Sequence, residues 1–250
     1  MIHMLIGIQG SGKTTFSKIL AKKLNCEIVS SDGVRNQHPD FTEDLVWPEI
    51  YRLVSVSVLN NKDIILTVSG VGKVSSSMIV SIMIDHFDNI EVIINLGVSG
   101  GYGALVTTGD VVVGTNYSYA DVDTSCFTGY EYGEVPGLPL YYYGDPDLIK
   151  KIKSKVVFGT ILTGDKFFTD FIECKKIVDE HFNDQNVCAF DMESTAIAQA
   201  CYLLNVPFLA IRAISDVIGK KDDATTRYRN YVEIACKKAS GVLFEILNNL

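Results

Sequence analysis

Two acidic side chains stand at the ends of apolar segments in the second half of the chain. Glu193 lies in residues 191–195 (DMEST), and Asp216 closes residues 212–216 (RAISD). A carboxyl group that is partly desolvated and bonded to a neighbouring hydroxyl, such as that of Ser215, can hold a proton near neutral pH. A second carboxylate can accept hydrogen bonds from two adjacent hydroxyl groups of a ligand. The pair indicates a catalytic site for a small polar molecule.

A phosphate-loop motif opens the chain. Residues 7–14 read GIQGSGKT, which fits G-x-x-x-x-G-K-T between an apolar strand and a helix. In this motif the helix N-terminus, Gly12 and Lys13 would hold phosphate oxygens, and Thr14 would face a magnesium ion. Residues 4–53 resemble the start of small P-loop kinases, but the remaining parts of such a kinase are missing downstream. Binding of ATP with Mg²⁺ and a purely structural role both stay open.

The composition excludes several classes of protein. The chain has 250 residues, 47% of them hydrophobic, which is enough for a sizeable core. The formal net charge is −8 and no basic block is present, so we expect no nucleic-acid partner. No signal peptide or apolar run of membrane-spanning length is found, so we expect no membrane partner. The spacing of the cysteines and histidines favours reduced thiols in a cytoplasmic protein without a metal site.

Strands and helices alternate along most of the chain. Apolar runs predict strands at 4–9, 27–31, 64–68, 92–96, 110–117, 156–162 and 207–214. Helical spacing predicts helices at 13–24, 74–87, 147–153, 168–182, 192–204 and 225–247. Residues 120–145 read as a long loop rich in Gly, Tyr and Pro, and loops of this length are usually functional. The alternation predicts an α/β fold whose mostly parallel sheet carries helices on both faces.

Residues 61–250 carry seven motifs in a fixed order. They are 68–73 (VSGVGK), 95–101 (NLGVSGG), 109–113 (GDVVV), 129–137 (GYEYGEVPG), 163–167 (TGDKF), 191–195 (DMEST) and 213–216 (AISD). This set resembles the 5′-methylthioadenosine/S-adenosylhomocysteine nucleosidases of the purine nucleoside phosphorylase superfamily. The resemblance implies a mixed twisted α/β sheet flanked by helices, a homodimer, and no metal or organic cofactor. It also implies that residues 1–60, the phosphate-loop segment, replace the family's own opening within one compact domain.

The family releases adenine from ribose by hydrolysis, and the resemblance assigns each acid a role. Asp216, with Ser215 beside it, matches the acid that protonates N7 of the departing adenine. Glu193 matches the carboxylate that accepts hydrogen bonds from the ribose 2′- and 3′-hydroxyls, and its charge favours the cationic sugar of the transition state. Taken singly, such acids are more often helix caps. The ordered motifs favour a substrate site.

Further substrate contacts are implied by the same resemblance. Met192 would lie against the sugar, Phe167 would stack on adenine, and the backbone of Phe168 would read the adenine edge. The remaining contacts, to the 5′-alkylthio tail and beneath the site, fall to Val71, Tyr228 and Gly100. The expected partner is therefore a small-molecule adenine nucleoside.

The general base is not identified. In the family, a glutamate after the first strand polarises the attacking water, whereas the phosphate loop laid over that strand puts Thr15 at this position. Threonine cannot take a proton from water at neutral pH, and loss of a general base typically costs about 10²- to 10⁴-fold in rate. We therefore expect impaired hydrolysis. Asp32 and Glu49 are alternative candidates for the base, although nothing in their spacing requires either of them.

Three other functions stay open. A purine nucleoside phosphorylase would use phosphate in place of water and would draw on Lys73, Ser69 and residues 75–77. A non-catalytic protein would bind an adenine nucleoside or ATP without turnover. An ATP-dependent small-molecule kinase would depend on Lys13.

Overall fold

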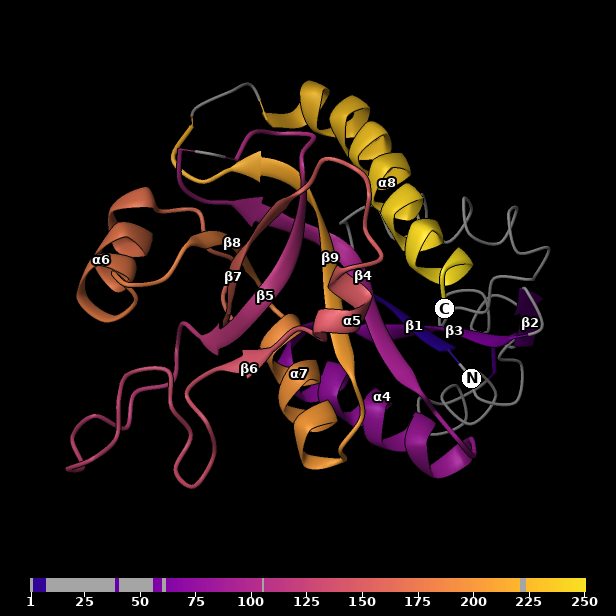
Figure 1. Ribbon diagram of the computed structural model, residues 1–250. Coiled ribbons are helices and arrows are strands. Elements are labelled where there is room, and N and C mark those ends of the chain that lie inside the picture. The colour runs from indigo at the N-terminus through magenta and orange to yellow at the C-terminus, as the bar shows by residue number, and fades with distance from the viewer. Residues whose placement is uncertain (1, 8–38, 41–55, 60–61, 105, 221–223) are drawn as a thin grey trace.

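A mixed sheet forms the centre of the fold, with helices packed on both of its faces (Figure 1). The computed structural model describes residues 2–7, 39–40, 56–59, 62–104, 106–220 and 224–250. Its strands are β1 (Ile2–Gly7), β2 (Val56–Leu59), β3 (Lys62–Gly70), β4 (Val92–Gly101), β5 (Val111–Tyr119), β6 (Tyr142–Tyr143), β7 (Val157–Thr163), β8 (Val187–Asp191) and β9 (Phe208–Val217). Its helices are α4 (Gly72–His86), α5 (Pro146–Ile149), α6 (Phe171–His181), α7 (Ser194–Leu203) and α8 (Ala224–Asn248).

The sheet is partly closed on itself. In the described part of the chain its strands run in the order β2-β3-β1-β4-β8-β7-β5-β6, and β9 pairs with both β4 and β5. Strands β4, β8, β7, β5 and β9 therefore form a ring. The β4–β9 and β7–β8 pairs are parallel, whereas the β4–β8 and β5–β9 pairs are antiparallel. The predicted mixed sheet flanked by helices is confirmed.

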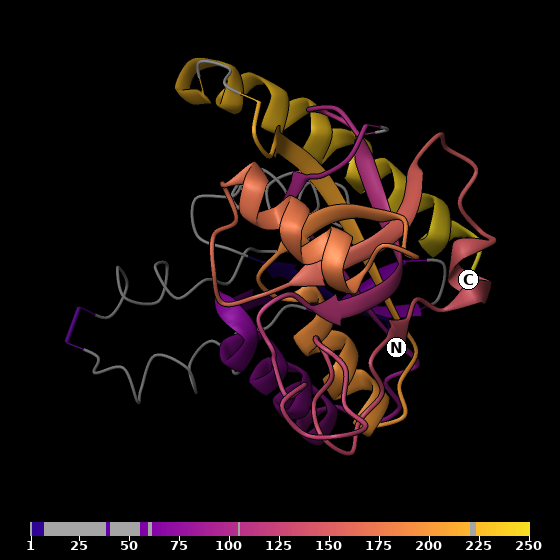
Figure 2. The same cartoon turned by 90° about the vertical axis from the view of Figure 1, so that its left-hand side faces the viewer.

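Helices cover the two faces of the sheet with different strand residues. Ile94 and Leu96 of β4 pack in one cluster with Leu243 of α8. Ile93, directly before Ile94, packs in a second cluster with Ile197 of α7 and with apolar residues of α4. This alternation follows from the two-residue period of a strand. As a result α8 lies on one side of the sheet, and α4 and α7 lie together on the other (Figure 2).

β1 lies inside the sheet, between β3 and β4, and runs parallel to both. Gly7, the first residue of the phosphate-loop motif, ends this strand and pairs with Gly70 of β3. The opening segment therefore supplies a strand to the same sheet that carries the two acids. The rest of the loop, with Gly12, Lys13 and Thr14, lies outside the described residues.

Several strands differ from the expectation, among them β8, β4 and β9. β8 was not predicted, because its five residues merge in the sequence with the apolar helix that follows. β4 continues to Gly101 rather than ending at residue 96. The glycines belong to the strand because they pair with β9. Their lack of a side chain leaves room for neighbours, since a Cβ at Gly97 would stand 2.0 Å from Nη1 of Arg212. β9 likewise continues to Val217 rather than ending at residue 214.

Among the described residues, no helix combines the length and the apolar character that crossing a membrane requires. Five cysteines of this part of the chain carry free thiols, and Cys126 is the exposed one among them.

Candidate active site

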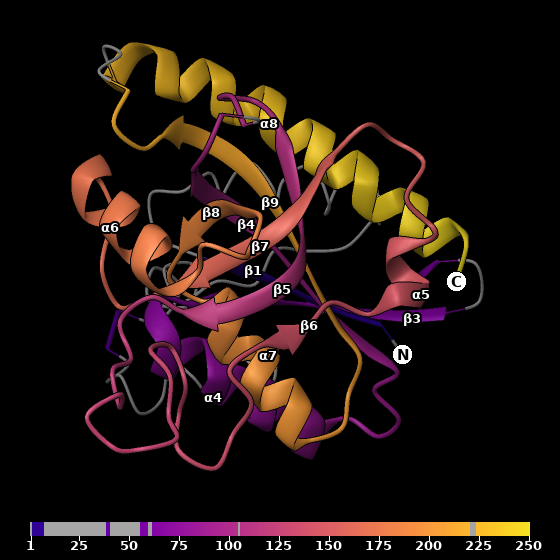
Figure 3. The same ribbon diagram turned by 60° about the vertical axis from the view of Figure 1, so that its left-hand side comes forward.

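The two acids come from strands on either side of β4. Gly100 of β4 pairs with Phe190 of β8 on one side and with Asp216 of β9 on the other. Because neighbouring strands lie about 4.8 Å apart, the end of β8 and Asp216 are separated by roughly 10 Å. Glu193 follows β8 after one intervening residue. The ring of strands, which bends in Figure 3, thus brings both carboxyl groups to one region of the sheet.

A β-bulge positions Asp216. Ser99 pairs with Ile214 and Gly100 with Asp216, so Ser215 is an extra residue in β9. Bulges of this kind re-aim the side chain that follows. The Ser215 hydroxyl donates a hydrogen bond of 2.6 Å to Oδ1 of Asp216. Burial raises the pKa of the Asp216 carboxyl above its ordinary value, and the hydrogen bond from Ser215 offsets part of that rise. Asp216 is therefore suited to hold and deliver a proton.

The raised pKa of Asp216 predicts a pH-dependent gain in stability for the Asp216→Asn variant. An acid with a raised folded-state pKa stabilises the protein below its unfolded pKa of about 3.9, and this contribution is lost as the pH rises through the folded pKa. We therefore expect the amide variant to exceed the unsubstituted chain in unfolding free energy at pH 8, and to do so by less at pH 4. Urea denaturation at pH 4 and pH 8 measures this. An equal loss of stability at both pH values would contradict it.

Glu193 belongs to a fully buried charge network. The side chains of Asp191, Glu193 and Arg212 are each 0% exposed. Nη2 of Arg212 lies 2.8 Å from Oδ2 of Asp191 and 3.6 Å from Oε2 of Glu193. The backbone N–H of Gly72 donates to Oε1 of Glu193 at 3.2 Å. A buried carboxylate is costly unless it is paired, so Arg212 and Gly72 offset the cost of burying Glu193 and fix its orientation.

Asp191 ties this network to the start of α7. Its Oδ1 accepts a hydrogen bond of 2.6 Å from the Thr163 hydroxyl and further bonds from the backbone N–H groups of Glu193 and Ser194. Nε and Nη2 of Arg212 both donate to the Ser194 hydroxyl, at 3.1 and 3.0 Å. The carboxylate of Glu193 is therefore positioned by the end of β8, the start of α7 and the guanidinium group of Arg212 together.

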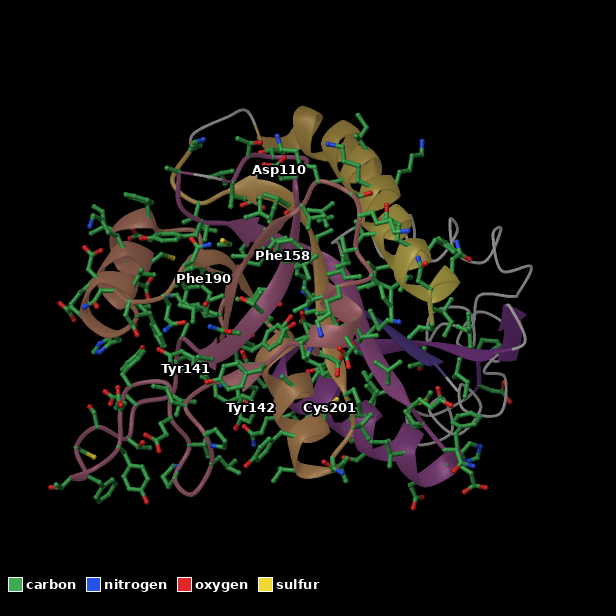
Figure 4. The ribbon with its side chains drawn as sticks, viewed as in Figure 1. Asp110, Tyr141, Tyr142, Phe158, Phe190 and Cys201 are labelled. Atoms are coloured by element: carbon green, nitrogen blue, oxygen red, sulfur yellow. The ribbon has the colours of Figure 1, made fainter. Side chains whose placement is uncertain are left out.

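The other predicted contact residues occupy different environments. Phe167 is 68% exposed, whereas Phe168 is 6% exposed and its ring packs on Phe190 with a centroid distance of 4.9 Å. Figure 4 shows Phe190 on the side of the sheet that faces α6. Val71 is partly exposed at the N-terminus of α4, and Met192 is half-buried between β8 and α7. The exposed ring of Phe167 is available to stack on a ligand, whereas the ring of Phe168 is buried in the core.

Several predicted positions lie beyond what the structure describes. Tyr228 falls within α8, but its side chain is not described. The phosphate-loop residues and the positions considered for the base also lie outside the described residues; they are Gly12, Lys13, Thr14, Thr15, Asp32 and Glu49. The described residues contain no group of three or more His, Cys, Asp or Glu side chains arranged to hold a metal ion.

The side chains considered for phosphate binding are engaged within the protein. Nζ of Lys73 donates to Asp121 at 2.9 Å. The Ser76 and Ser77 hydroxyls each donate to a backbone carbonyl of α4 at 3.1 Å, and the Ser69 hydroxyl donates to the Gly70 carbonyl at 3.4 Å. Phosphorolysis would need cationic or hydroxyl groups turned toward the ligand, and these contacts do not favour it.

Comparison with known proteins identifies the family of this chain. The family described as the phosphorylase superfamily matches residues 36–248. The chain belongs to the phosphorylase superfamily. A second family, described as an AAA domain, matches residues 2–52, which contain the phosphate-loop motif.

Relatives within the phosphorylase superfamily are nucleosidases. A 5′-methylthioadenosine/S-adenosylhomocysteine nucleosidase of Psychromonas ingrahamii is 38% identical over 200 residues, which cover 77% of this chain and 84% of the relative. The structure of such a nucleosidase from Colwellia psychrerythraea in complex with adenine is 30% identical, with a TM-score of 0.78, and the match covers 100% of this chain and 96% of that one. The Neisseria meningitidis nucleosidase in complex with methylthio-immucillin-A is 28% identical, with a TM-score of 0.78 and coverage of 100% and 99%. The resemblance inferred from the seven motifs is confirmed.

The sequence did not identify Arg212 and Gly72 as site residues of this superfamily member. Arg212 stands in the apolar run of β9, and a charged residue in a buried strand was the available signal. Gly72 contacts Glu193 across 121 positions of sequence, and no local pattern indicates such a contact.

Proposed function

We propose that this chain hydrolyses the N-glycosidic bond of 5′-methylthioadenosine and S-adenosylhomocysteine and releases adenine. The observation that carries the proposal is the pair of acids in opposite environments on either side of β4. Burial raises the pKa of Asp216, which suits a proton donor. Glu193 is buried against Arg212 and the N–H of Gly72, which suits a fixed acceptor. Nucleosidase relatives with adenine or a nucleoside analogue bound support this assignment.

Asp216 acts on the leaving group in this proposal. Adenine departs as an anion unless a proton reaches its N7, so a protonated carboxyl at that atom lowers the barrier. The short bond from Ser215 holds the Asp216 carboxyl in one orientation. The proton moves from Asp216 to N7 as the bond from N9 to C1′ breaks, and neutral adenine leaves.

Glu193 acts on the sugar. Two adjacent ribose hydroxyls can both donate to a carboxylate, which accepts hydrogen bonds at both of its oxygens. As the glycosidic bond breaks, positive charge develops on the ribose, and a fixed negative charge beside it stabilises that state more than the ground state. Arg212 and Gly72 hold the Glu193 carboxylate still, so little reorganisation is needed during the reaction.

The remaining predicted residues would contact the adenine, the sugar and the 5′ tail of the substrate. Phe167 would stack on adenine, the backbone of Phe168 would read the adenine edge, and Met192 would lie against the sugar. Val71, Tyr228 and Gly100 would contact the 5′ tail and the space beneath the site. At Gly100 a Cβ would stand 3.8 Å from Oδ2 of Asp216, so the glycine leaves room beside the acid.

The attacking water requires a base that these residues do not provide. The loss of the base at the position of Thr15, its replacement by Asp32 or Glu49, and an impaired rate all stay predictions. We propose that the reaction itself uses no metal or organic cofactor. Binding of ATP with Mg²⁺ at Gly12, Lys13 and Thr14 would be a separate property of the opening segment.

We also propose a homodimer in the cytoplasm. Exposed apolar side chains gather on α4, on α7 and on the neighbouring strand β6, namely Val74, Met78, Tyr143, Tyr202 and Leu203. A face of this kind, on helices that pack together, suits an interface between two copies of the chain. Light scattering of the purified chain measures the dimer. The free thiols of the described residues suit a reducing compartment.

The test of the proposed function is release of adenine from both substrates by the purified chain, with the sugar product identified by mass. Hydrolysis gives free 5-methylthioribose from methylthioadenosine, with no dependence on phosphate. Formation of the sugar 1-phosphate would reassign the chain as a phosphorylase. Absence of adenine release in either buffer would leave only a binding function.

A further inference from the structure

Three charged residues close a ring of hydrogen bonds at the N-terminus of α4. The backbone N–H of Lys73 donates to Oδ1 of Asp165 at 2.8 Å. The backbone N–H of Asp165 donates to Oδ2 of Asp121 at 2.7 Å. Nζ of Lys73 completes the ring with bonds of 2.9 and 3.0 Å to the two carboxylate oxygens of Asp121. We call Lys73, Asp121 and Asp165 the clasp.

The clasp joins segments that are far apart in the sequence. Lys73 lies in the first turn of α4, Asp121 follows β5, and Asp165 follows β7. Two of these segments carry proposed substrate contacts. Gly72, directly before Lys73, donates its N–H to Glu193, and Phe167 stands two residues after Asp165. The clasp therefore connects the backbone that holds the ribose carboxylate to the backbone that carries the exposed aromatic ring.

Glycine at position 72 fits the close approach of Asp165 to the start of α4. Gly72 has φ of +82°, and a Cβ at this position would stand 2.8 Å from Oδ1 of Asp165. Any other residue would be strained and would push Asp165 away. Glycine at position 72 thus allows Asp165 to sit against the start of α4.

The charges reinforce one another more than in an isolated surface pair. Nζ of Lys73 also lies 3.9 Å from Oδ2 of Asp165 and 5.2 Å from the centroid of the Tyr119 ring. The Lys73 and Asp121 side chains are 23% and 27% exposed. A single exposed ion pair contributes little, but here both carboxylates also accept backbone N–H groups, and charge-assisted bonds of this type are the stronger ones.

We propose that the clasp is a positioning device that sets the separation between Glu193 and Phe167, and thereby the affinity of the site for its adenine nucleoside. This inference rests on the proposed function. The clasp residues take no part in protonating the base or holding the sugar, so the bond-breaking step does not depend on them directly. Loosening the clasp should move Phe167, whose stacking on adenine contributes to ground-state and transition-state binding alike, while Arg212 still holds Glu193. We therefore expect KM to rise and kcat to stay unchanged.

The Asp121→Asn substitution tests the clasp because it removes the charge and keeps the size of the side chain. We expect KM for methylthioadenosine to rise about tenfold while kcat stays within about threefold. Because salt screens partly exposed charges, KM of the unsubstituted chain should rise between 0.05 and 0.5 M NaCl by a larger factor than KM of the variant. Lys73→Arg, which keeps the cation, should lie closer to the unsubstituted chain than Lys73→Met.

A matched control is available on α5. Lys150 and Asp147 form an exposed ion pair with the same distance of 2.9 Å, remote from the proposed contacts. Asp147→Asn should leave both KM and its salt dependence unchanged. An Asp121→Asn variant that behaves like this control would overturn the inference, as would a variant whose kcat falls as much as its kcat/KM.

Hydrogen exchange separates failure of the clasp from failure of the proposed function. The backbone amides of Lys73 and Asp165 donate within the clasp, so their exchange should accelerate in Asp121→Asn and stay unchanged in Asp147→Asn. If the chain releases no adenine, the proposed function fails, and faster exchange at these two amides would still support the coupling of the segments. Unchanged exchange would refute the clasp whatever the activity.

Discussion

The Asp216→Asn variant is expected to release adenine about 10²- to 10⁴-fold more slowly than the unsubstituted chain, the usual contribution of a general acid. Asparagine has the size of aspartate and can still accept the hydrogen bond from Ser215, so the site should keep its shape. The amide has no acidic proton to give to N7 of adenine. The loss should therefore fall on kcat, with KM changed little.

Steady-state adenine release from methylthioadenosine measures this effect. Asp88→Asn, at an exposed position after α4, is a matched control and should keep full activity. The expected gain in stability of Asp216→Asn at pH 8 separates lost chemistry from lost folding. A variant that retains activity within about threefold would remove Asp216 from the role of general acid, since that role is worth at least about 10²-fold.

The Arg212→Met substitution is expected to lower the unfolding free energy by about 3–5 kcal/mol, because it removes the cation from a buried charge network. Asp191 and Glu193 would remain fully buried with no cation to offset their charges. Domains of this kind are stable by only about 5–15 kcal/mol, so this is a large fraction of the total. Adenine release should also fall, because Glu193 loses the group that orients it.

Urea denaturation of the unsubstituted chain, Arg212→Met and Arg212→Lys measures this loss. Lysine keeps the charge but cannot reproduce the two hydrogen bonds to Ser194 together with the ion pair to Asp191, so this variant should fall between the other two. Equal denaturation midpoints for Arg212→Met and the unsubstituted chain would show that the network contributes nothing to stability.

The larger elements of the fold could be predicted because their patterns are periodic and long. The helices of residues 72–86 and 194–203 and the strands of residues 62–70 and 157–163 all lie within a few residues of their expected positions. β8 has five residues and runs without a turn signal toward α7, so its pattern could not be separated from that helix. The extension of β4 through Gly97 pairs with β9, and Gly97 leaves room for the Arg212 side chain; the sequence displays neither tertiary contact.

The candidate site likewise contains residues that the sequence could predict and contacts that it could not. Asp216 and Glu193 were predicted because each stands in a motif with ordered neighbours. The groups that hold Glu193 come from β9 and from the start of α4, and those contacts arise only after the sheet has closed. The clasp is a similar case, since Asp121 lies in a loop and bonds to Lys73 across 48 positions.

The most direct test of the two-acid account is a crystal structure of the Asp216→Asn variant with 5′-methylthioadenosine bound and uncleaved. The account predicts Glu193 within about 3 Å of both ribose hydroxyls, and the side chain at position 216 within about 3 Å of N7. A nucleoside that occupies the site with its ribose away from Glu193, or with N7 out of reach of position 216, would contradict it.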